Sequence, residues 1–219
     1  IKDDDPHYAV TKLLCLENTI SGKVQPQNHL EVLANAAHKK NLKVHLDGAR
    51  LFNAHIYTGA SMKQLTSCFD SVSICLSKGL GAPIGSLLIA DQATINTARR
   101  LRKMLGGGMR QVGVIAACGM YALKNNVKRL QNDHDNAKLL ADGLSSISEL
   151  SVDYGERQTN MVFVNCPKGH RESLENFLFD KDVMISNLDR GRLVCHLGIE
   201  EKDILFVIDS FKEYFKRAS

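Results

Sequence analysis

Residues 42–50 of the chain read Leu-Lys-Val-His-Leu-Asp-Gly-Ala-Arg. An apolar run ends here at Leu46 and is followed at once by the carboxylate of Asp47. A second apolar run, residues 72–76, is followed by Ser-Lys-Gly with the lysine at position 78. Short apolar runs that stop at polar residues and glycine predict buried strands. The sequence therefore places an acid and an amine at the ends of two strands.

Strands and helices can be predicted throughout the first half of the chain. Apolar and β-branched runs predict strands at 11–17, 42–47, 71–77 and 84–90. Three- and four-residue apolar steps, Pro26 and the capping residue Asp91 predict helices at 26–40, 50–57 and 91–105. Because strand and helix alternate, we expect an α/β layer with a largely parallel sheet flanked by helices.

The second half has a different pattern. Three glycines, 106–108, end the helix before them, and a second helix runs to about residue 125. A long amphipathic helix is predicted over 126–147, followed by strands at 161–165 and 192–197, a helix at 170–179 and a final helix from residue 200. We expect two domains, 1–127 and a smaller α+β domain at 128–219.

Composition excludes several classes of protein. The net charge is only +4, and the basic group on one predicted helix has no interleaved aromatic residues, which favours a solvated helix face over nucleic-acid binding. No apolar run reaches the ~18 residues of a membrane span. Six cysteines without C-x-x-C spacing favour reduced thiols and hence a cytoplasmic location, or the mitochondrial matrix. We expect neither a nucleic-acid nor a membrane partner.

Five segments resemble the L-threonine aldolases of the low-specificity type, in their family order. They are residues 16–19 (Leu-Glu-Asn-Thr), 45–54 around Asp47, 77–83 around Lys78, 105–111 with the three glycines, and 192–196 (Arg-Leu-Val-Cys-His). Cys195 stands where a threonine is more usual. These aldolases belong to the aspartate-aminotransferase-like superfamily, fold type I, whose enzymes use pyridoxal 5'-phosphate (PLP).

The resemblance implies a fold. The large domain of the family holds a seven-stranded sheet of order 3-2-4-5-6-7-1, and the four predicted strands resemble the fourth to the seventh. The chain thus resembles a family member that lacks its N-terminal part. The four strands should be neighbours, and a partner or a further segment should cover the two edges of their sheet.

The resemblance also implies roles at the cofactor. The amine of Lys78 would condense with the PLP aldehyde, and Asp47 would keep the pyridine nitrogen protonated. A dry cleft would lower the pKa of that amine. Arg50 would contact the phenolic oxygen of PLP, and Ser77 and Arg110 its phosphate. The residues alone leave other interpretations open: an exposed loop lysine, a helix N-cap or an Asp47–Arg50 ion pair, and a strand-end serine.

Two further residues would act on the substrate. Arg192 resembles the arginine that grips the substrate α-carboxylate, a task that suits a planar guanidinium, although an exposed arginine at a strand start is the alternative. His7 resembles a histidine near the substrate hydroxyl and would serve as the base or orient a water; it could equally be an exposed histidine near the chain end. His45 and Asp47 share a strand face, but no third metal ligand follows, so we expect no metal.

These roles together imply a PLP-dependent aldehyde-lyase. It would cleave L-threonine or L-allo-threonine to glycine and acetaldehyde by retro-aldol chemistry, within threonine catabolism. The resemblance implies a homo-oligomer, a dimer or a tetramer. Two alternatives remain open: a catalytically incompetent truncated fragment or isoform, and a PLP-dependent β-eliminating lyase.

Overall fold

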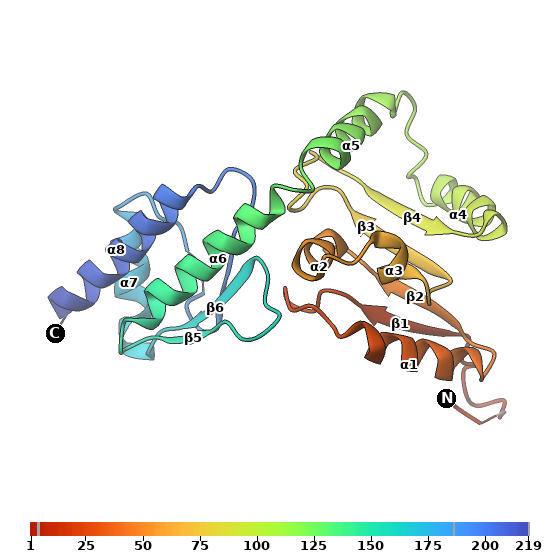
Figure 1. The fold of residues 1–219 in the computed structure, drawn as a ribbon, viewed down its shortest axis with the longest axis horizontal. Coiled ribbons are helices and arrows are strands. Elements are labelled where there is room, and N and C mark those ends of the chain that lie inside the picture. Colours follow the sequence, from red (N-terminus) through yellow and green to blue (C-terminus); the bar gives the residue numbers. More distant parts are fainter. Residues whose placement is uncertain (4, 186, 219) are drawn as a thin grey trace. The chain divides into compact units, whose positions relative to one another are not determined.

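A computed structural model describes residues 1–3, 5–185 and 187–218. The chain divides into two compact units (Figure 1). Unit 1 comprises residues 1–20 and 24–128, and unit 2 comprises residues 21–23 and 129–219. Residues 21–23 join unit 2 through hydrogen bonds that the sequence pattern does not reveal: Thr159 donates through its amide to the carbonyl of Gly22 at 3.0 Å and through its hydroxyl to the same carbonyl at 2.6 Å.

The sheet of unit 1 has the strand order β1-β2-β3-β4. The strands are β1 (Leu13–Glu17), β2 (Lys43–Asp47), β3 (Ser71–Cys75) and β4 (Ser86–Ala90). The first three are parallel, and β4 is antiparallel to β3. The connection between β3 and β4 is short and turns at Gly81 and Gly85, both at positive φ, so it cannot form a crossover. The expected α/β class and the neighbouring order of the four strands are confirmed.

One face of this sheet is apolar and covered. Helices α1 (Gln27–His38), α2 (Leu51–Thr58) and α3 (Met62–Thr66) pack their apolar residues against it. The sheet contributes Val44, Leu46, Val72 and Ile74, which alternate with polar residues along β2 and β3. The other face carries those polar residues, among them Asp47. Helix α3 was not predicted from the sequence, although Ser61 and Gln64 form a capping box at its start.

Two further helices complete unit 1. Helix α4 (Gln92–Met104) begins as predicted, because the side chain of Asp91 accepts a hydrogen bond from the amide of Thr94 at 2.9 Å. It ends before Gly106, whose φ is +83°. Helix α5 (Gly113–Asn125) follows. Its C-terminal turn is fastened by the side chain of Asn126, which donates to the carbonyl of Leu80 at 2.7 Å.

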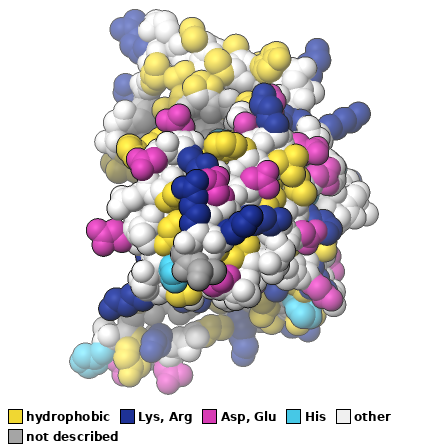
Figure 2. All heavy atoms as spheres, turned by 90° about the vertical axis from the view of Figure 1, so that its left-hand side faces the viewer, with side chains coloured by type: hydrophobic (Ala, Val, Ile, Leu, Met, Phe, Trp, Pro, Cys, Tyr) yellow, Lys and Arg dark blue, Asp and Glu magenta, His cyan; other side chains and the backbone are white. Residues whose placement is uncertain are grey.

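Unit 2 contains a three-stranded antiparallel sheet of order β5-β6-β7. Its elements are α6 (Leu130–Ser145), β5 (Ser151–Asp153), β6 (Met161–Asn165), the 3-10 turn Lys168–His170, α7 (Arg171–Phe179), β7 (Gly191–Val194) and α8 (Glu201–Ala218). The helix expected from residue 126 begins four residues later, since 126–129 form a turn. The three-residue β5 was too short to be predicted. Figure 2 shows acidic and basic side chains interspersed on the face toward the viewer.

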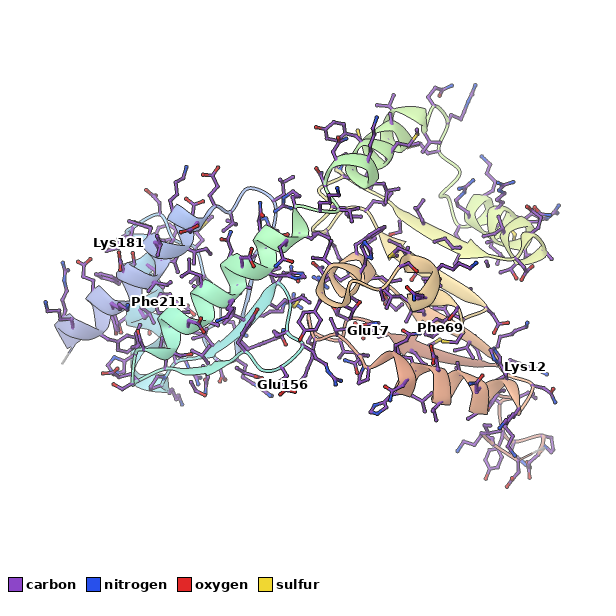
Figure 3. The ribbon with its side chains drawn as sticks, viewed as in Figure 1. Lys12, Glu17, Phe69, Glu156, Lys181 and Phe211 are labelled. Carbon is purple, nitrogen blue, oxygen red and sulfur yellow. The ribbon has the colours of Figure 1, made fainter. Side chains whose placement is uncertain are left out.

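The core of unit 2 lies between its helices and its sheet. Phe211 of α8 is fully buried (Figure 3), together with Leu144 of α6 and Val162 of β6. Helix α6 approaches α8 most closely at Gly143, where a Cβ atom would lie 2.4 Å from Cδ1 and 2.9 Å from Cγ2 of Ile208. Because two different branches of a buried side chain are in the way, the absence of a side chain at this position permits the approach.

Replacing Gly143 by alanine should therefore destabilise unit 2. Overpacking costs about 1–3 kcal/mol and exceeds the gain of up to ~1 kcal/mol in helix propensity. Urea unfolding should show a lower midpoint for Gly143→Ala. Gly169→Ala is the matched control, because a Cβ there meets no atom within 4 Å. Equal midpoints for the two variants would contradict the close approach.

The amino ends of β2 and β3 are fastened by Asp70. Its carboxylate accepts hydrogen bonds from Lys43 Nζ and from the amide of Val44, each at 2.8 Å, and lies 2.8 Å from Nε2 of His38. Burial by itself would raise the pKa of Asp70, but the hydrogen bonds from Lys43, His38 and Val44 outweigh burial and lower the pKa from 3.8 to about 2.

A pKa that is lower in the folded state gives stability that is present above the unfolded value of 3.8 and lost as the pH falls through about 2. Asp70→Asn should therefore be less stable than the wild type at pH 7, by about 1 kcal/mol after allowance for solvent screening. The difference should shrink as the pH falls from about 5 toward 2. Paired urea titrations at several pH values test this, and a difference independent of pH would contradict it.

Candidate functional site

Asp47 lies at the carboxyl end of β2 and is exposed. The chain turns immediately after it, and the amide of Gly48 donates to the carbonyl of Ser73 on β3 at 2.8 Å. A Cβ on residue 48 would lie 2.9 Å from that carbonyl oxygen, so glycine is required. The carboxylate of Asp47 accepts a hydrogen bond from the amide of Ala49 at 2.9 Å. The N-cap of α2 is Arg50, so the interpretation of Asp47 as that cap is wrong.

Asn18 fastens Asp47 from the other side. The backbone amide of Asn18 donates to the carbonyl of Asp47 at 3.0 Å, and the side-chain Oδ1 of Asn18 accepts from the backbone amide of Gln25 at 3.1 Å. The side chain is fully buried, and its Nδ2 has no hydrogen-bond partner among the described residues, nor has the buried hydroxyl of Thr19. The sequence reading gave Asn18 no role, although the Leu-Glu-Asn-Thr segment was one of the five that carried the resemblance.

Lys78 follows β3 in a tight turn. The carbonyl of Lys78 accepts a hydrogen bond from the amide of Gly81 at 2.8 Å, and the φ of Gly81 is +74°. Ser77 and Lys78 are exposed, whereas Leu80 is buried. The described residues therefore do not form the expected dry cleft around Lys78.

The structure brings four of the predicted residues to one edge of the sheet of unit 1. Asp47 and Arg50 follow the carboxyl end of β2, while Ser77 and Lys78 follow that of β3, the next strand. The carboxyl ends of parallel strands are where open α/β sheets bind their ligands.

The other two predicted residues of unit 1 lie elsewhere. His7 precedes the amino end of β1. In Figure 3, Lys12 is labelled near that end of the strand, and Glu17 is labelled at the carboxyl end. Its Nδ1 lies 2.8 Å from the carboxylate of Asp5, and the ring is exposed. Arg110 is exposed in the turn between α4 and α5. The structure thus does not bring His7 to the edge that carries Asp47.

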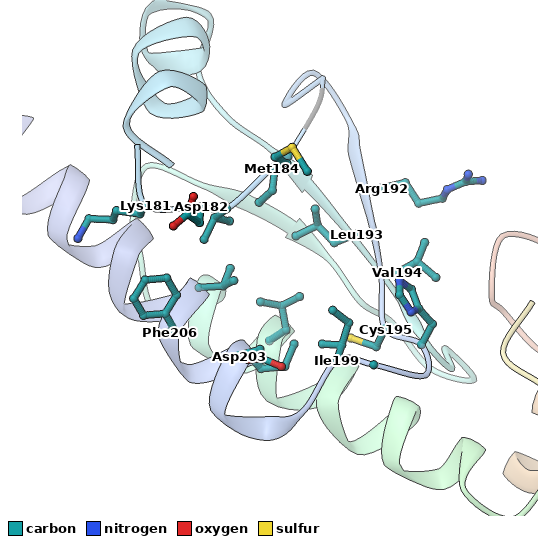
Figure 4. Close-up of a pocket in the computed structure, with 17 residues that line it drawn as sticks. Lys181, Asp182, Met184, Arg192, Leu193, Val194, Cys195, Ile199, Asp203 and Phe206 are labelled. Carbon is teal, nitrogen blue, oxygen red and sulfur yellow. The ribbon is translucent and has the colours of Figure 1, made fainter. Parts of the chain in front are cut away.

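Arg192 belongs to unit 2. It lies on β7, is exposed, and lines a cavity of about 790 Å³ between β7, α8 and the segment 181–185. The lining combines apolar side chains, such as Leu193, Ile199 and Phe206, with charged ones, such as Lys181 and Asp203. In Figure 4 the guanidinium of Arg192 points away from these side chains.

Cys195 is buried beside this strand. Its amide donates to the carbonyl of Asn160 at 2.9 Å, and the side-chain amide of Asn160 donates back to the carbonyl of Cys195 at 2.9 Å. Burial, and then the charge of Asp133, raise the pKa of the Cys195 thiol to about 12. The thiol is therefore neutral and inert at physiological pH, and it serves packing.

The residues at the carboxyl edge fit PLP by the chemistry of their groups. A carboxylate suits a pyridinium, a primary amine an aldehyde, and a guanidinium and a hydroxyl suit anionic oxygens. These four groups are Asp47, Lys78, Arg50 and Ser77. Within the described residues no three His, Cys, Asp or Glu side chains converge to hold a metal, and Nδ1 of His45 already lies 2.7 Å from the Ser71 hydroxyl. Among the same residues no helix is apolar and long enough to cross a membrane.

Comparison with known proteins gives consistent similarities. The low specificity L-threonine aldolase of Escherichia coli (strain K12) is 45% identical over 217 residues, which are 99% of this chain and 64% of that protein. The low-specificity L-threonine aldolase of Candida albicans is 44% identical over 205 residues, covering 92% of this chain and 54% of that protein. This chain thus spans less than two thirds of the length of these relatives.

A solved structure of Leishmania major threonine aldolase has the same fold. It superposes with a TM-score of 0.79 at 20% sequence identity, over 97% of this chain and 64% of that one. The sequence model of one family, described as beta-eliminating lyase, matches residues 1–167. With the acid and the amine at the ends of neighbouring parallel strands, and with this match over most of its length, the chain belongs to the beta-eliminating lyase family.

Proposed function

We propose that this chain is part of a PLP-dependent aldehyde-lyase that cleaves β-hydroxy-α-amino acids such as L-threonine and L-allo-threonine to glycine and acetaldehyde. The observation that carries the proposal is the position of Asp47 and Lys78 at the carboxyl ends of adjacent strands β2 and β3. The names of the relatives, low-specificity L-threonine aldolases at 44–45% identity, support the choice of substrate.

Four residues of unit 1 would hold the cofactor, which supplies an electron sink when bound. The carboxylate of Asp47 would pair with the ring nitrogen and keep its proton in place. Lys78 would hold the cofactor covalently through its aldehyde carbon. Arg50 would donate to the phenolic oxygen, and the hydroxyl of Ser77 to the phosphate.

The fixed backbone around Asp47 supports this assignment. A carboxylate that must meet one ring atom needs a stationary main chain, and the amides of Asn18 and Gly48 hold residues 47 and 48 from both neighbouring strands. The amide of Ala49 also holds one oxygen of the Asp47 side chain at 2.9 Å.

Two arginines complete the proposal. Arg192 would bind the substrate carboxylate through both oxygens and so orient the bond that breaks. Arg110 would help to hold the phosphate, within its own chain or across an interface between copies. His7 has no part in this assignment, since it precedes the amino end of β1.

Association and location are part of the same proposal. Helices α4 and α5 leave large apolar side chains exposed, among them Met104, Leu105, Val114, Met120 and Tyr121. Such surface favours a homo-oligomer, a dimer or a tetramer. All six cysteines are free, which suits a reducing compartment such as the cytoplasm or the mitochondrial matrix. Charges of both signs are mixed on the face in Figure 2, which gives no support to a nucleic-acid partner.

The family description favours a second candidate reaction. The family model that matches residues 1–167 is described as beta-eliminating lyase. A β-elimination at PLP would use the same acid and lysine but would remove a leaving group from the β-carbon. Since Asp47 and Lys78 serve either reaction, the substrate and not the cofactor site separates the two.

The covalent role of Lys78 can be tested directly. Sodium borohydride added to the protein with saturating PLP should fix a phosphopyridoxyl group on the peptide that contains Lys78, as peptide mass spectrometry will show. Lys78→Arg keeps the charge but cannot form the bond, so it should stay unlabelled. Lys124→Arg, at an exposed lysine of α5, is the control and should label as the wild type does. A colourless and unlabelled wild type would support an incompetent fragment instead.

Product analysis separates the two reactions. L-threonine should yield equal amounts of glycine and acetaldehyde, and L-serine should yield little pyruvate. Asp47→Asn should lower the rate of threonine cleavage by roughly 100-fold or more, because an amide cannot hold the proton on the ring nitrogen. Pyruvate formed from serine faster than glycine from threonine would favour the β-eliminating reaction.

A further inference from the structure

Glu17 lies next to Asp47 across the first strand pair. The register of the parallel strands β1 and β2 pairs Glu17 with Asp47, so the two residues occupy the same level of the sheet. Adjacent strands lie ~4.8 Å apart, and side chains at paired positions project from the same face. Both side chains are exposed at the carboxyl edge, and Figure 3 shows Glu17 at that end of β1.

This pair is unfavourable as it stands. Like charges that are directly paired across strands destabilise a sheet. Among the described residues, the side chain of Glu17 makes no hydrogen bond or ion pair, although its backbone takes part in the pairing of β1 with β2. A feature that costs stability and has no local partner is typical of a functional site. The two carboxylates together would instead favour a cation placed against them.

The backbone gives Glu17 a fixed position. The next residue, Asn18, is bonded to the carbonyl of Asp47 through its amide and to the amide of Gln25 through its side chain. The fully buried Nδ2 of Asn18 has no acceptor among the described residues. A buried donor without an acceptor is unfavourable, so this edge suits a polar group that the described residues do not supply.

We propose that Glu17 is a positioning residue for the ring nitrogen of PLP: its carboxylate adds a second negative charge beside Asp47 and so strengthens the hold on the protonated nitrogen. The inference rests on the proposed function, in which Asp47 meets that nitrogen. Glu17 acts on the ring nitrogen through its negative charge, while Asp47 remains the residue that contacts that nitrogen.

Other charged and titratable groups of unit 1 surround the same edge. Arg50 follows β2 and Lys78 follows β3, and each adds positive charge. His45 and Cys15 precede Asp47 and Glu17 on the same face of β2 and β1, and the strand register pairs them with each other. The ring of His45 is turned to Ser71 through its Nδ1. Glu17 is thus the acidic group that the strand register pairs with Asp47.

The size of the effect follows from charge separation. One unit charge at about 6–8 Å in a partly exposed site changes the pKa of a neighbouring cation by roughly half to one pH unit, which is about a three- to tenfold change in affinity for its proton. Glu17→Gln removes the charge and keeps the shape. Glu17→Asp keeps the charge on a shorter side chain.

The test uses the intact protein that carries this chain, loaded with PLP labelled with ¹⁵N at the ring nitrogen. The ¹⁵N chemical shift followed against pH reports the protonation midpoint, and reconstitution of the apoprotein gives the dissociation constant of PLP. In Glu17→Gln the midpoint should fall by roughly half to one pH unit, and PLP should bind about three- to tenfold more weakly. Glu17→Asp should keep most of both properties.

Glu156→Gln is the matched control, because it removes one exposed negative charge from the loop between β5 and β6 of unit 2. It should behave as the wild type. Without PLP, Glu17→Gln should unfold at a temperature at least as high as the wild type does, because the variant removes the repulsion between Glu17 and Asp47. A Glu17→Gln protein that binds PLP with the wild-type midpoint would overturn the inference and leave the proposed function standing. A wild type that takes up no PLP, or holds its nitrogen unprotonated at neutral pH, would overturn both.

Discussion

The candidate site depends on a short series of backbone hydrogen bonds across the ends of three parallel strands. The amide of Asn18 donates to the carbonyl of Asp47, and the amide of Gly48 donates to the carbonyl of Ser73. These bonds continue the pairing of β1, β2 and β3 one step past the strands, to the point where the chain turns. Asp47 is thereby held by main-chain atoms on both sides, and its carboxylate is presented to solvent without a long side chain to order.

Gly48 is the sequence feature that permits this arrangement. A side chain at that position would meet the Ser73 carbonyl at 2.9 Å, and the strand ends would have to separate. The apolar face of the same strands, with Leu46 buried against α2, holds the sheet to its helices. The face that carries Leu46 stabilises the sheet, and the candidate residue Asp47 belongs to the opposite face, because successive side chains along a strand point to opposite faces.

In unit 2 as well, the packed core and the exposed candidate residue Arg192 are separate. Its core, which includes Leu144 and Phe211, is apolar and closely packed, as the close approach of Gly143 to Ile208 shows. Arg192 is exposed on β7, beside a cavity that both apolar and charged residues line. The cysteine that stands at the usual threonine position near it is buried and neutral, so this departure from the family pattern adds no reactive group.

Most of the elements of unit 1 could be predicted from the sequence alone, because they follow from local rules: apolar periodicity, capping by Asp91, and glycines at turns. The neighbouring order of the strands and the choice of Asp47 and Lys78 as candidate residues came instead from the resemblance to the threonine aldolases. Short elements with weak local signals, α3 and β5, were not predicted, and neither was the turn that delays the start of α6.

Which side chains lie close together depends on the tertiary structure. The strand pairing places Glu17 in register with Asp47. His7 precedes the amino end of β1, although His7 and Glu17 are close to each other in the sequence. The reason is geometric: a strand separates its two ends by its full length, while pairing between strands joins residues that are far apart in sequence.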